Sequence, residues 1–170
     1  DPESSRIWVA GYVLRDAAVR PSSWRSQRSL QDELRASEVV GICEVDTRAI
    51  TRHLRDLGVM RAGIFSGAAL VDAEGRRRTT DDLRAQVAAT PAMAGADLAG
   101  EVSTAEAYTV EPVAGSLAPG EQPLTVVAVD LGIKSMTPQR FAERGVRTHV
   151  VPSSITGAEL LALRPDGVFF

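Results

Sequence analysis

The spacing of apolar and polar residues changes near residue 124. Before it, short apolar runs alternate with polar segments that carry helix-cap signals; after it, longer apolar runs predict strands covered on both faces. The most regular unit of the first part is EVVGICEVDTRAITRHLRDLGVMRAGIFS, residues 38–66. Its order of strand, capped helix, glycine and extended segment indicates mixed α/β structure.

Within this segment, the β-favouring residues 39–45 predict a strand that stops at Asp46. The Asp46 carboxylate can cap the following helix, and Gly58 can end it. An extended pattern resumes at residues 60–65. Residues at i, i+4 and i+7 give the helix one apolar stripe, formed by Ile50, Leu54 and Leu57. The helix arginines lie mostly off that stripe: Arg48, Arg52 and Arg55.

Two capping boxes predict further helices. Ser29 with Asp32 predicts a helix over residues 30–36, and Thr79 with Asp82 predicts one from residue 80 to about 89. Thr90-Pro91 ends the second helix, because proline disfavours the helical conformation of the residue before it. Near the start of the chain, residues 5–14 predict a strand interrupted at Gly11.

Residues 111–123 are the best linker of the sequence, with three prolines, two glycines and little to bury. The segment before them is predicted to be irregular over residues 91–100 and partly extended over 101–110. We therefore predict one domain over residues 1–110 and a second over 124–170.

The second domain has a βαβαβ pattern. Strands are predicted over residues 124–129, 146–151 and 168–170, with one helix starting at Thr137-Pro138 and stopped by Gly145. The other helix begins at a capping box formed by Thr156 and Glu159. Its predicted inward side is apolar and consists of Leu160, Leu161 and Leu163. Right-handed crossovers predict an open parallel sheet with helices on both faces.

Composition excludes several classes of protein. With 19 Lys plus Arg against 22 Asp plus Glu, the net charge of −3 disfavours a general nucleic-acid binder. Cys43 is the only cysteine, so no internal disulfide forms and a reducing compartment is expected. No apolar run approaches the ~20 residues that cross a bilayer. The chain begins at Asp1, which is typical of a processed or partial polypeptide.

Several segments, taken in order, resemble the small, glutamine-hydrolysing subunit of carbamoyl-phosphate synthetase. They are SSWRSQRSLQDEL, VVGICEVDTRAITRHLRDLGVMRAGI, EVSTAEAY and VVAVDLGIKSMTPQRFAERGVRTHVVPSSITGAELLALRPDGVFF. The resemblance implies that residues 1–110 are the C-terminal part of the small-subunit N-terminal α/β domain. Residues 111–123 are then a linker, and residues 124–170 begin a class I glutamine amidotransferase domain with a flavodoxin-like parallel sheet.

The resemblance also implies a function. A cysteine thiolate attacks the amide of L-glutamine, and the released ammonia passes to a large subunit. That partner uses ATP, Mg²⁺ and bicarbonate to make carbamoyl phosphate for arginine and pyrimidine biosynthesis in a cytoplasmic heterodimer or larger assembly. The nucleophilic Cys and its His and Glu are expected beyond Phe170. We therefore expect no catalytic, cofactor-binding or metal-binding residue in this chain, and no activity of the 170 residues alone.

Several residues could be interpreted as catalytic or metal-binding, but a structural interpretation fits each of them better. Cys43 lies in an apolar strand pattern and is interpreted as a small packed core residue. His53 and His149 are isolated, with no Cys or carboxylate at ligand spacing, so a metal site is not predicted. The acidic pairs Asp81–Asp82 and Asp32–Glu33 fit helix N-termini, where the helix dipole favours negative charge.

The remaining charged motifs are also weak. Arg48, Arg52, Arg55 and Arg61 fit a solvated helix side, with a face for an acidic partner as the alternative. Residues 76–78 are too few for a nucleic-acid stripe. Residues 132–135, Gly-Ile-Lys-Ser, lack the earlier glycine of a phosphate loop because position 128 is Ala128, so Lys134 is given a structural role.

Three alternatives stay open at this point. The first half can be a docking module for a synthetase-like partner, without chemistry of its own. The chain can belong to another amidotransferase that delivers ammonia to a different acceptor. A receiver-like domain is weaker: Asp130 ends the first long strand, but the acidic pair before it and a downstream Lys are missing.

Overall fold

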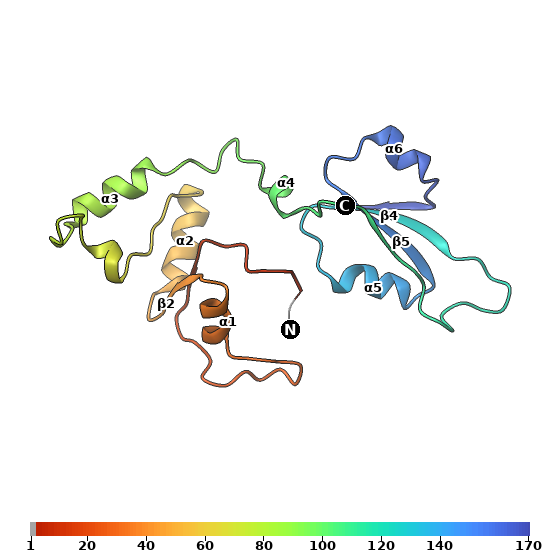
Figure 1. Cartoon of the computed structure of the whole chain (residues 1–170), viewed down its shortest axis with the longest axis horizontal. Helices are drawn as coiled ribbons and strands as arrows, with labels where there is room; N and C mark the ends of the chain where they lie inside the picture. Colours follow the sequence, from red (N-terminus) through yellow and green to blue (C-terminus); the bar gives the residue numbers. More distant parts are fainter. Residues whose placement is uncertain (1–2) are drawn as a thin grey trace. The chain divides into compact units, whose positions relative to one another are not determined.

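The computed structural model describes residues 3–170 and divides them into two compact units (Figure 1). Unit 1 is Arg6–Ala96, and unit 2 is Asp97–Phe170 together with residues 3–5. The strands and helices are those of a mixed α/β protein, as the sequence predicts. Within the described residues, no helix is both long enough and apolar enough to cross a bilayer.

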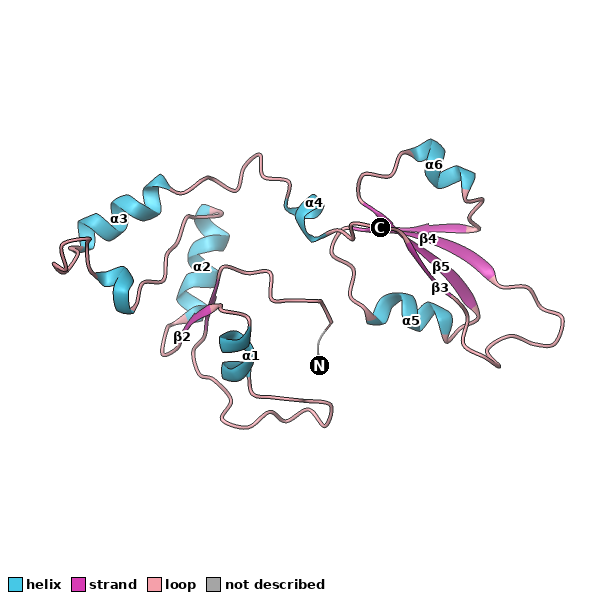
Figure 2. Ribbon diagram, in the orientation of Figure 1, coloured by secondary structure: helices cyan, strands magenta, loops and turns pink. Residues whose placement is uncertain are grey.

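Unit 1 contains a small parallel ladder and three α-helices. Strand β1 (Gly11–Val13) pairs with β2 (Val40–Ile42), with Gly11 opposite Val40. Both strands are shorter than predicted, because only three residues of each find a partner. Residues 60–65 form no strand, which corrects the extended element predicted there. Figure 2 shows how much of this unit is loop.

The helices of unit 1 begin where their caps predict. Helix α1 (Leu30–Ala36) is capped by the Ser29 hydroxyl, α2 (Thr47–Leu57) by the Asp46 carboxylate and α3 (Thr80–Ala89) by the Thr79 hydroxyl. A short 3₁₀ helix, η1 (Gly67–Leu70), lies between α2 and α3. These bounds confirm the predicted helices, because each cap acts within one turn of its own helix.

Unit 1 buries little apolar surface. Among the described residues of 6–96, Leu34 is the only buried apolar side chain. The predicted stripe of α2 is uncovered: Ile50 is 37% exposed, Leu54 38% and Leu57 74%. The pattern places these side chains on one face, but no other part of the described chain buries them.

Unit 2 is built on a four-stranded sheet with the order β3-β5-β4-β6. Strands β4 (Leu124–Asp130), β5 (Val146–Pro152) and β6 (Gly167–Phe169) are mutually parallel where they pair, and β3 (Tyr108–Val110) runs antiparallel to β5. The three parallel strands match the predicted ones to within about a residue. Figure 2 shows the strands of this sheet lying side by side.

The core of unit 2 lies on both faces of β4 and β5, and the helices α5 (Met136–Ala142) and α6 (Gly157–Ala162) cover opposite faces (Figure 1). On one face, three β-strand valines pack with a leucine of α6, and this cluster is Val127, Val129, Val151 and Leu160. On the other face, Phe141 of α5 meets Phe169 of β6 edge to face at 5.6 Å between ring centroids. Leu160 points inward as predicted, but Leu161 is 69% exposed because successive helix residues are about 100° apart.

The region before β4 departs from the predicted irregular chain. Residues Leu98–Val102 form helix α4, capped by the Asp97 carboxylate. Strand β3 belongs to the same sheet as β5, so residues 97–110 lie structurally with unit 2 although the sequence places them in the first domain. Glu111, in the predicted linker, is tied to this sheet by an ion pair with Arg147 at 2.9 Å. The division at 111–123 into two family domains stays a prediction.

Two capping boxes hold their carboxylates in the charged form. In α6, the Thr156 amide and hydroxyl donate to Glu159, and these hydrogen bonds lower the pKa of that carboxyl. In α3, the Thr79 hydroxyl and amide lower the pKa of Asp82 in the same way. Both boxes are predicted from the sequence because all their atoms lie within four residues.

Candidate functional site

The carboxyl ends of the parallel strands are the first candidate site. Strand β5 lies on one side of β4, and the next strand along the chain, β6, lies on the other side of β4. The direction in which strands are added to the sheet therefore reverses at β4. Open α/β sheets bind ligands outside the carboxyl ends of the strands at such a switch point. In this chain that edge is formed by Asp130 at the end of β4 and by Phe169 at the end of β6.

Asp130 organises the backbone at this edge. Its side chain is buried, with 7% of the residue exposed, and it accepts three backbone hydrogen bonds. The Gly132 and Ile133 amides donate to Oδ1 at 2.9 Å each, and the Thr104 amide donates to Oδ2 at 2.8 Å. One carboxylate therefore holds the β4–α5 loop and a segment 26 residues away. A receiver-like aspartate would need free oxygens, and both oxygens here are occupied.

Two further hydrogen-bonded contacts complete the edge. The Ser153 amide, after β5, donates to the Ser103 hydroxyl at 2.8 Å. At the start of α5, the Met136 amide and the Ser135 hydroxyl donate to one carboxylate oxygen of Glu3, at 3.2 and 3.3 Å. Ser135 makes no side-chain cap, so Glu3 supplies the acceptor that this helix start lacks. The predicted start, with Thr137 as cap and Pro138 as first helical residue, is two residues late.

The sequence pattern does not indicate these roles. An aspartate after an apolar strand is visible in the sequence, and the following Leu-Gly pair marks a turn. The partners Thr104 and Glu3 are far away along the chain, and no local pattern indicates them.

Tyr108 also lies near Asp130: partial burial raises the pKa of the Tyr108 phenol, and the Asp130 charge adds to that shift.

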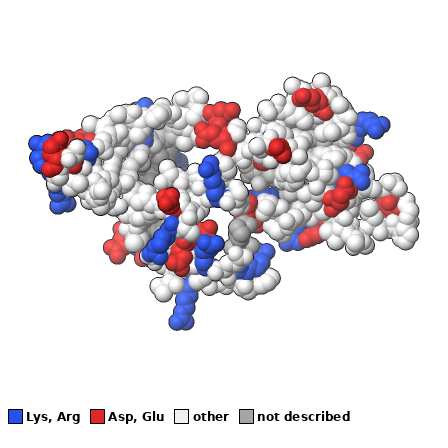
Figure 3. Space-filling model, in the orientation of Figure 1, with Lys and Arg blue, Asp and Glu red and all other residues white. Residues whose placement is uncertain are grey.

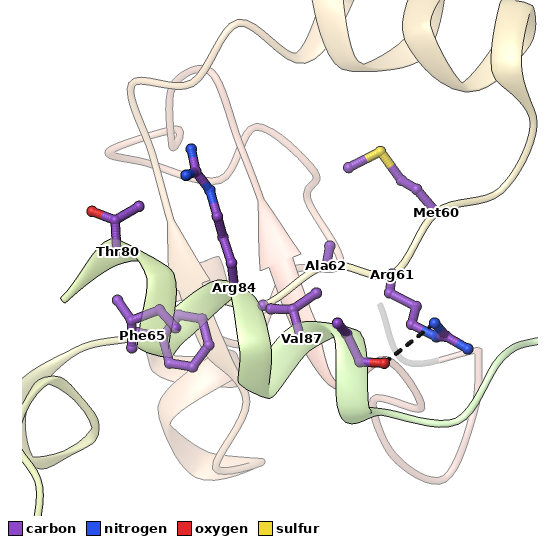
Figure 4. Close-up of a pocket in the computed structure, with 10 residues that line it drawn as sticks. Met60, Arg61, Ala62, Phe65, Thr80, Arg84 and Val87 are labelled. Carbon is purple, nitrogen blue, oxygen red and sulfur yellow. Dashed lines mark hydrogen bonds between the residues drawn. The ribbon is translucent and has the colours of Figure 1, made fainter. Parts of the chain in front are cut away.

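The second candidate is an open groove in unit 1, between residues 60–65 and helix α3 (Figure 4). Its volume is about 540 Å³ and its lining is mainly apolar. In Figure 4, Phe65 lies beside Val87, while Met60 and Arg84 extend from the two walls. Gly63 lets these walls approach, because a Cβ there would lie 2.9 Å from Val87 Cγ2.

The groove has no catalytic chemistry. Its lining holds no carboxylate, histidine, cysteine or lysine within the described chain. Both of its guanidinium groups are already engaged: Arg61 donates to the Ala88 carbonyl at 3.3 Å, and Arg84 pairs with Asp81 at 3.2 Å. The groove can bind an apolar group, but the Thr80 hydroxyl has no base in the lining to activate it as a nucleophile.

The structure separates the residues that the sequence singled out. Cys43 is exposed, so its interpretation as a packed core residue is wrong; β2 ends at Ile42, and Cys43 lies outside the paired ladder. His53 is exposed on α2. His149, in β5, has Nδ1 2.8 Å from the Thr109 hydroxyl of β3, where it links two strands.

The remaining candidates form no cluster. No group of three His, Cys, Asp or Glu side chains within residues 3–170 is placed to hold a metal ion. In the loop after β4, the Lys134 carbonyl accepts from the Thr137 amide at 2.9 Å, and the structural role of Lys134 stays a prediction. Arg48, Arg52 and Arg55 are exposed along α2.

Comparison with known proteins gives one consistent result. The family model described as "Carbamoyl-phosphate synthase small chain, CPSase domain" matches residues 1–64. The whole chain is 58% identical over 172 residues to the carbamoyl phosphate synthase small chain of Bifidobacterium longum. It is 55% identical to that of Streptomyces avermitilis over 170 residues, and 52% identical over 171 residues to that of Mycobacterium tuberculosis.

These matches cover this chain almost completely but their relatives only in part. They span 99–100% of the present sequence and 41–43% of the three relatives. The chain thus spans about two fifths of the length of the curated relatives it matches.

Proposed function

Because the chain belongs, over the residues given, to the carbamoyl phosphate synthase small-chain family, we propose that it forms part of a small subunit that hydrolyses glutamine. The ammonia would pass to a large subunit, which uses ATP, Mg²⁺ and bicarbonate to make carbamoyl phosphate. The assembly would serve arginine and pyrimidine biosynthesis in the cytoplasm. The observation that carries this proposal is the 50–58% identity across the chain to proteins named as this small chain.

The sheet of unit 2 supports an amidotransferase fold in this proposal. Its parallel strands have the order β5-β4-β6, so the first strand lies in the middle, as in flavodoxin-like sheets. In the proposed subunit, residues 124–170 begin the class I glutamine amidotransferase domain. The carboxyl edge at Asp130 and Phe169 would then form a wall of the glutamine site.

The proposed contribution of this chain is positional. Asp130 fixes the β4–α5 loop through the Gly132 and Ile133 amides, and Glu3 fixes the start of α5. A rigid loop at a ligand edge orients substrate without reacting with it. We assign no catalytic, cofactor-binding or metal-binding residue to these 170 residues and propose that they are inactive alone.

A different ammonia-donating enzyme is less well supported. The match of residues 1–64 is to a domain named for the carbamoyl phosphate synthase small chain. A pure docking role also agrees with the absence, among the described residues, of a group of three His, Cys, Asp or Glu placed to hold a metal ion. It differs from the proposal in one measurable respect, glutamate release by the complete subunit.

The test is glutaminase activity. Glutamate release is measured for the complete small chain that carries these residues, with and without the large chain, and for the 170 residues alone. We expect release by the complete chain, a higher rate with the large chain, and none by the 170 residues.

Two outcomes would contradict the proposal. Binding of the large chain without any glutamate release would leave docking as the function. Glutamate release by the 170 residues would place the chemistry inside them, and a Cys43→Ser variant would then show whether the exposed thiol is responsible.

A further inference from the structure

We propose that the three arginines Arg48, Arg52 and Arg55, the α2 arginine row, bind a row of carboxylates on a partner protein. The row lies on one side of α2, since residues at i, i+4 and i+7 project from one face of a helix. All three side chains are exposed. Within residues 3–170, none of them makes a side-chain hydrogen bond or an ion pair.

The missing pairs set α2 apart from the other helices. Each of three helices pairs an arginine with a carboxylate three residues away: Arg35 with Asp32 in α1, Arg84 with Asp81 in α3 and Arg140 with Glu143 in α5. In α2, the positions three or four residues from the arginines hold mainly uncharged residues or further arginines. Asp56 is four residues after Arg52, but the two side chains do not pair.

The row also opposes the stability of its own helix. Arg48 and Arg52 are like charges at i,i+4, and Arg52 and Arg55 at i,i+3, and both spacings place the side chains close together. Arg48 lies in the first turn, where the helix dipole disfavours positive charge. That turn contains no acidic residue, and the cap Asp46 is the carboxylate at this end of the helix. Residues that break local rules without a compensating contact mark sites of function.

The chemistry of the row selects a carboxylate partner. Guanidinium groups bind carboxylates in a two-bond fork, and seven residues of helix space the outer two arginines by about 10 Å along the axis. A partner helix with Asp or Glu at i, i+4 and i+7 has the same spacing. A nucleic acid fits less well: the chain carries a net charge of −3, and positive and negative side chains are interspersed on the face seen in Figure 3.

This inference rests on the proposed function, because the large chain is the partner in which the carboxylates are sought. The test measures binding between the complete small chain and the large chain at low and high salt. Arg52→Glu reverses the central charge of the row. Arg20→Glu is the matched control, since Arg20 is also exposed in unit 1 and makes no ion pair among the described residues.

We expect R52E to weaken binding at least about tenfold at low salt and to flatten its salt dependence, with R20E within about twofold of the parent. Thermal unfolding separates this role from a structural one. R52E replaces two repulsive pairs, with Arg48 and Arg55, by attractive ones and creates one repulsive pair, with Asp56, so its unfolding midpoint should not fall. A structural role would lower the midpoint together with the affinity.

Three results would overturn the inference. If R52E binds as the parent does, or R52E and R20E weaken binding equally, the row is not the contact, while the proposed function stands. If R52E still binds the large chain but no longer binds tRNA or anionic vesicles, the ligand of the row is a nucleic acid or an anionic membrane surface. If the parent does not bind the large chain, the proposed function itself fails.

Discussion

Single residues in this chain act mainly by accepting backbone hydrogen bonds. Asp130 is the strongest case, since one buried carboxylate satisfies three amides from two segments. The sequence shows an aspartate at the end of an apolar strand but not the Thr104 amide that approaches it. Cys43 shows the opposite error: its apolar neighbours predict burial, yet Cys43 is exposed, as is Ile42 beside it, because unit 1 buries little apolar surface.

Replacing Asp130 by Asn should destabilise unit 2 by roughly 2–3 kcal/mol, because the amide group has only one accepting atom and the Thr104 amide then faces a donor. Chemical denaturation monitored through unit 2 measures the change. Asp166→Asn is the control: Asp166 is exposed and its side chain accepts from the Thr125 amide at 2.7 Å, so the loss should stay below about 1 kcal/mol. Equal losses in the two variants would contradict the special role of Asp130.

Helices are the elements that the sequence predicts best. The caps Ser29, Asp46, Thr79 and Thr156 all bond amides within their own first turn, and the helices begin beside them. Helix α4 is one exception, since its Asp97 cap lies in a segment predicted to be irregular. Helix α5 is another, because its acceptor is Glu3, more than 130 residues away. A helix start supplied by a distant residue leaves no local pattern to find.

Two glycines of unit 2 should respond oppositely to alanine. Gly145 has φ +77°, and a Cβ there would lie 2.6 Å from Leu117 Cδ2, so Gly145→Ala should cost about 1–2 kcal/mol. Gly157 begins α6, and a Cβ there meets no atom within 4 Å, so Gly157→Ala should stabilise by about 0.5 kcal/mol. Thermal and urea unfolding of both variants tests the pair. Stabilisation by Gly145→Ala would contradict the backbone geometry at the end of α5.

At the scale of the molecule, burial is uneven. Nearly all the buried apolar residues belong to unit 2, around β4 and β5, whereas Leu34 is the one found in residues 6–96. Helix α2 is an eleven-residue helix without a buried side chain among the residues described. Helices of this length are marginal in water unless tertiary packing covers their apolar face.

Amide hydrogen exchange should therefore differ strongly between the two units. Amides of β4 and β5 lie in a covered sheet and should exchange slowest, while those of α2 should exchange fastest among the helices of ten or more residues. Exchange monitored by mass spectrometry on the isolated 170 residues measures both. Protection of α2 equal to that of β4 would mean that its apolar stripe is covered in solution.

The sequence by itself predicted the resemblance to the small-chain family, the α/β class, most helix bounds and the three parallel strands. These features depend on caps within one turn and on apolar runs along a single strand, so neighbouring residues are sufficient to specify them. The apolar stripe and the arginine row of α2 are likewise visible from helical spacing alone.

Only the tertiary structure decided which strands become neighbours, that β3 joins the sheet of β5, and which amides Asp130 and Glu3 bind. It also decided that Cys43 and the stripe of α2 are exposed. These facts depend on contacts between residues tens of positions apart. A carboxylate or an apolar side chain has the same local pattern whether or not a distant segment reaches it.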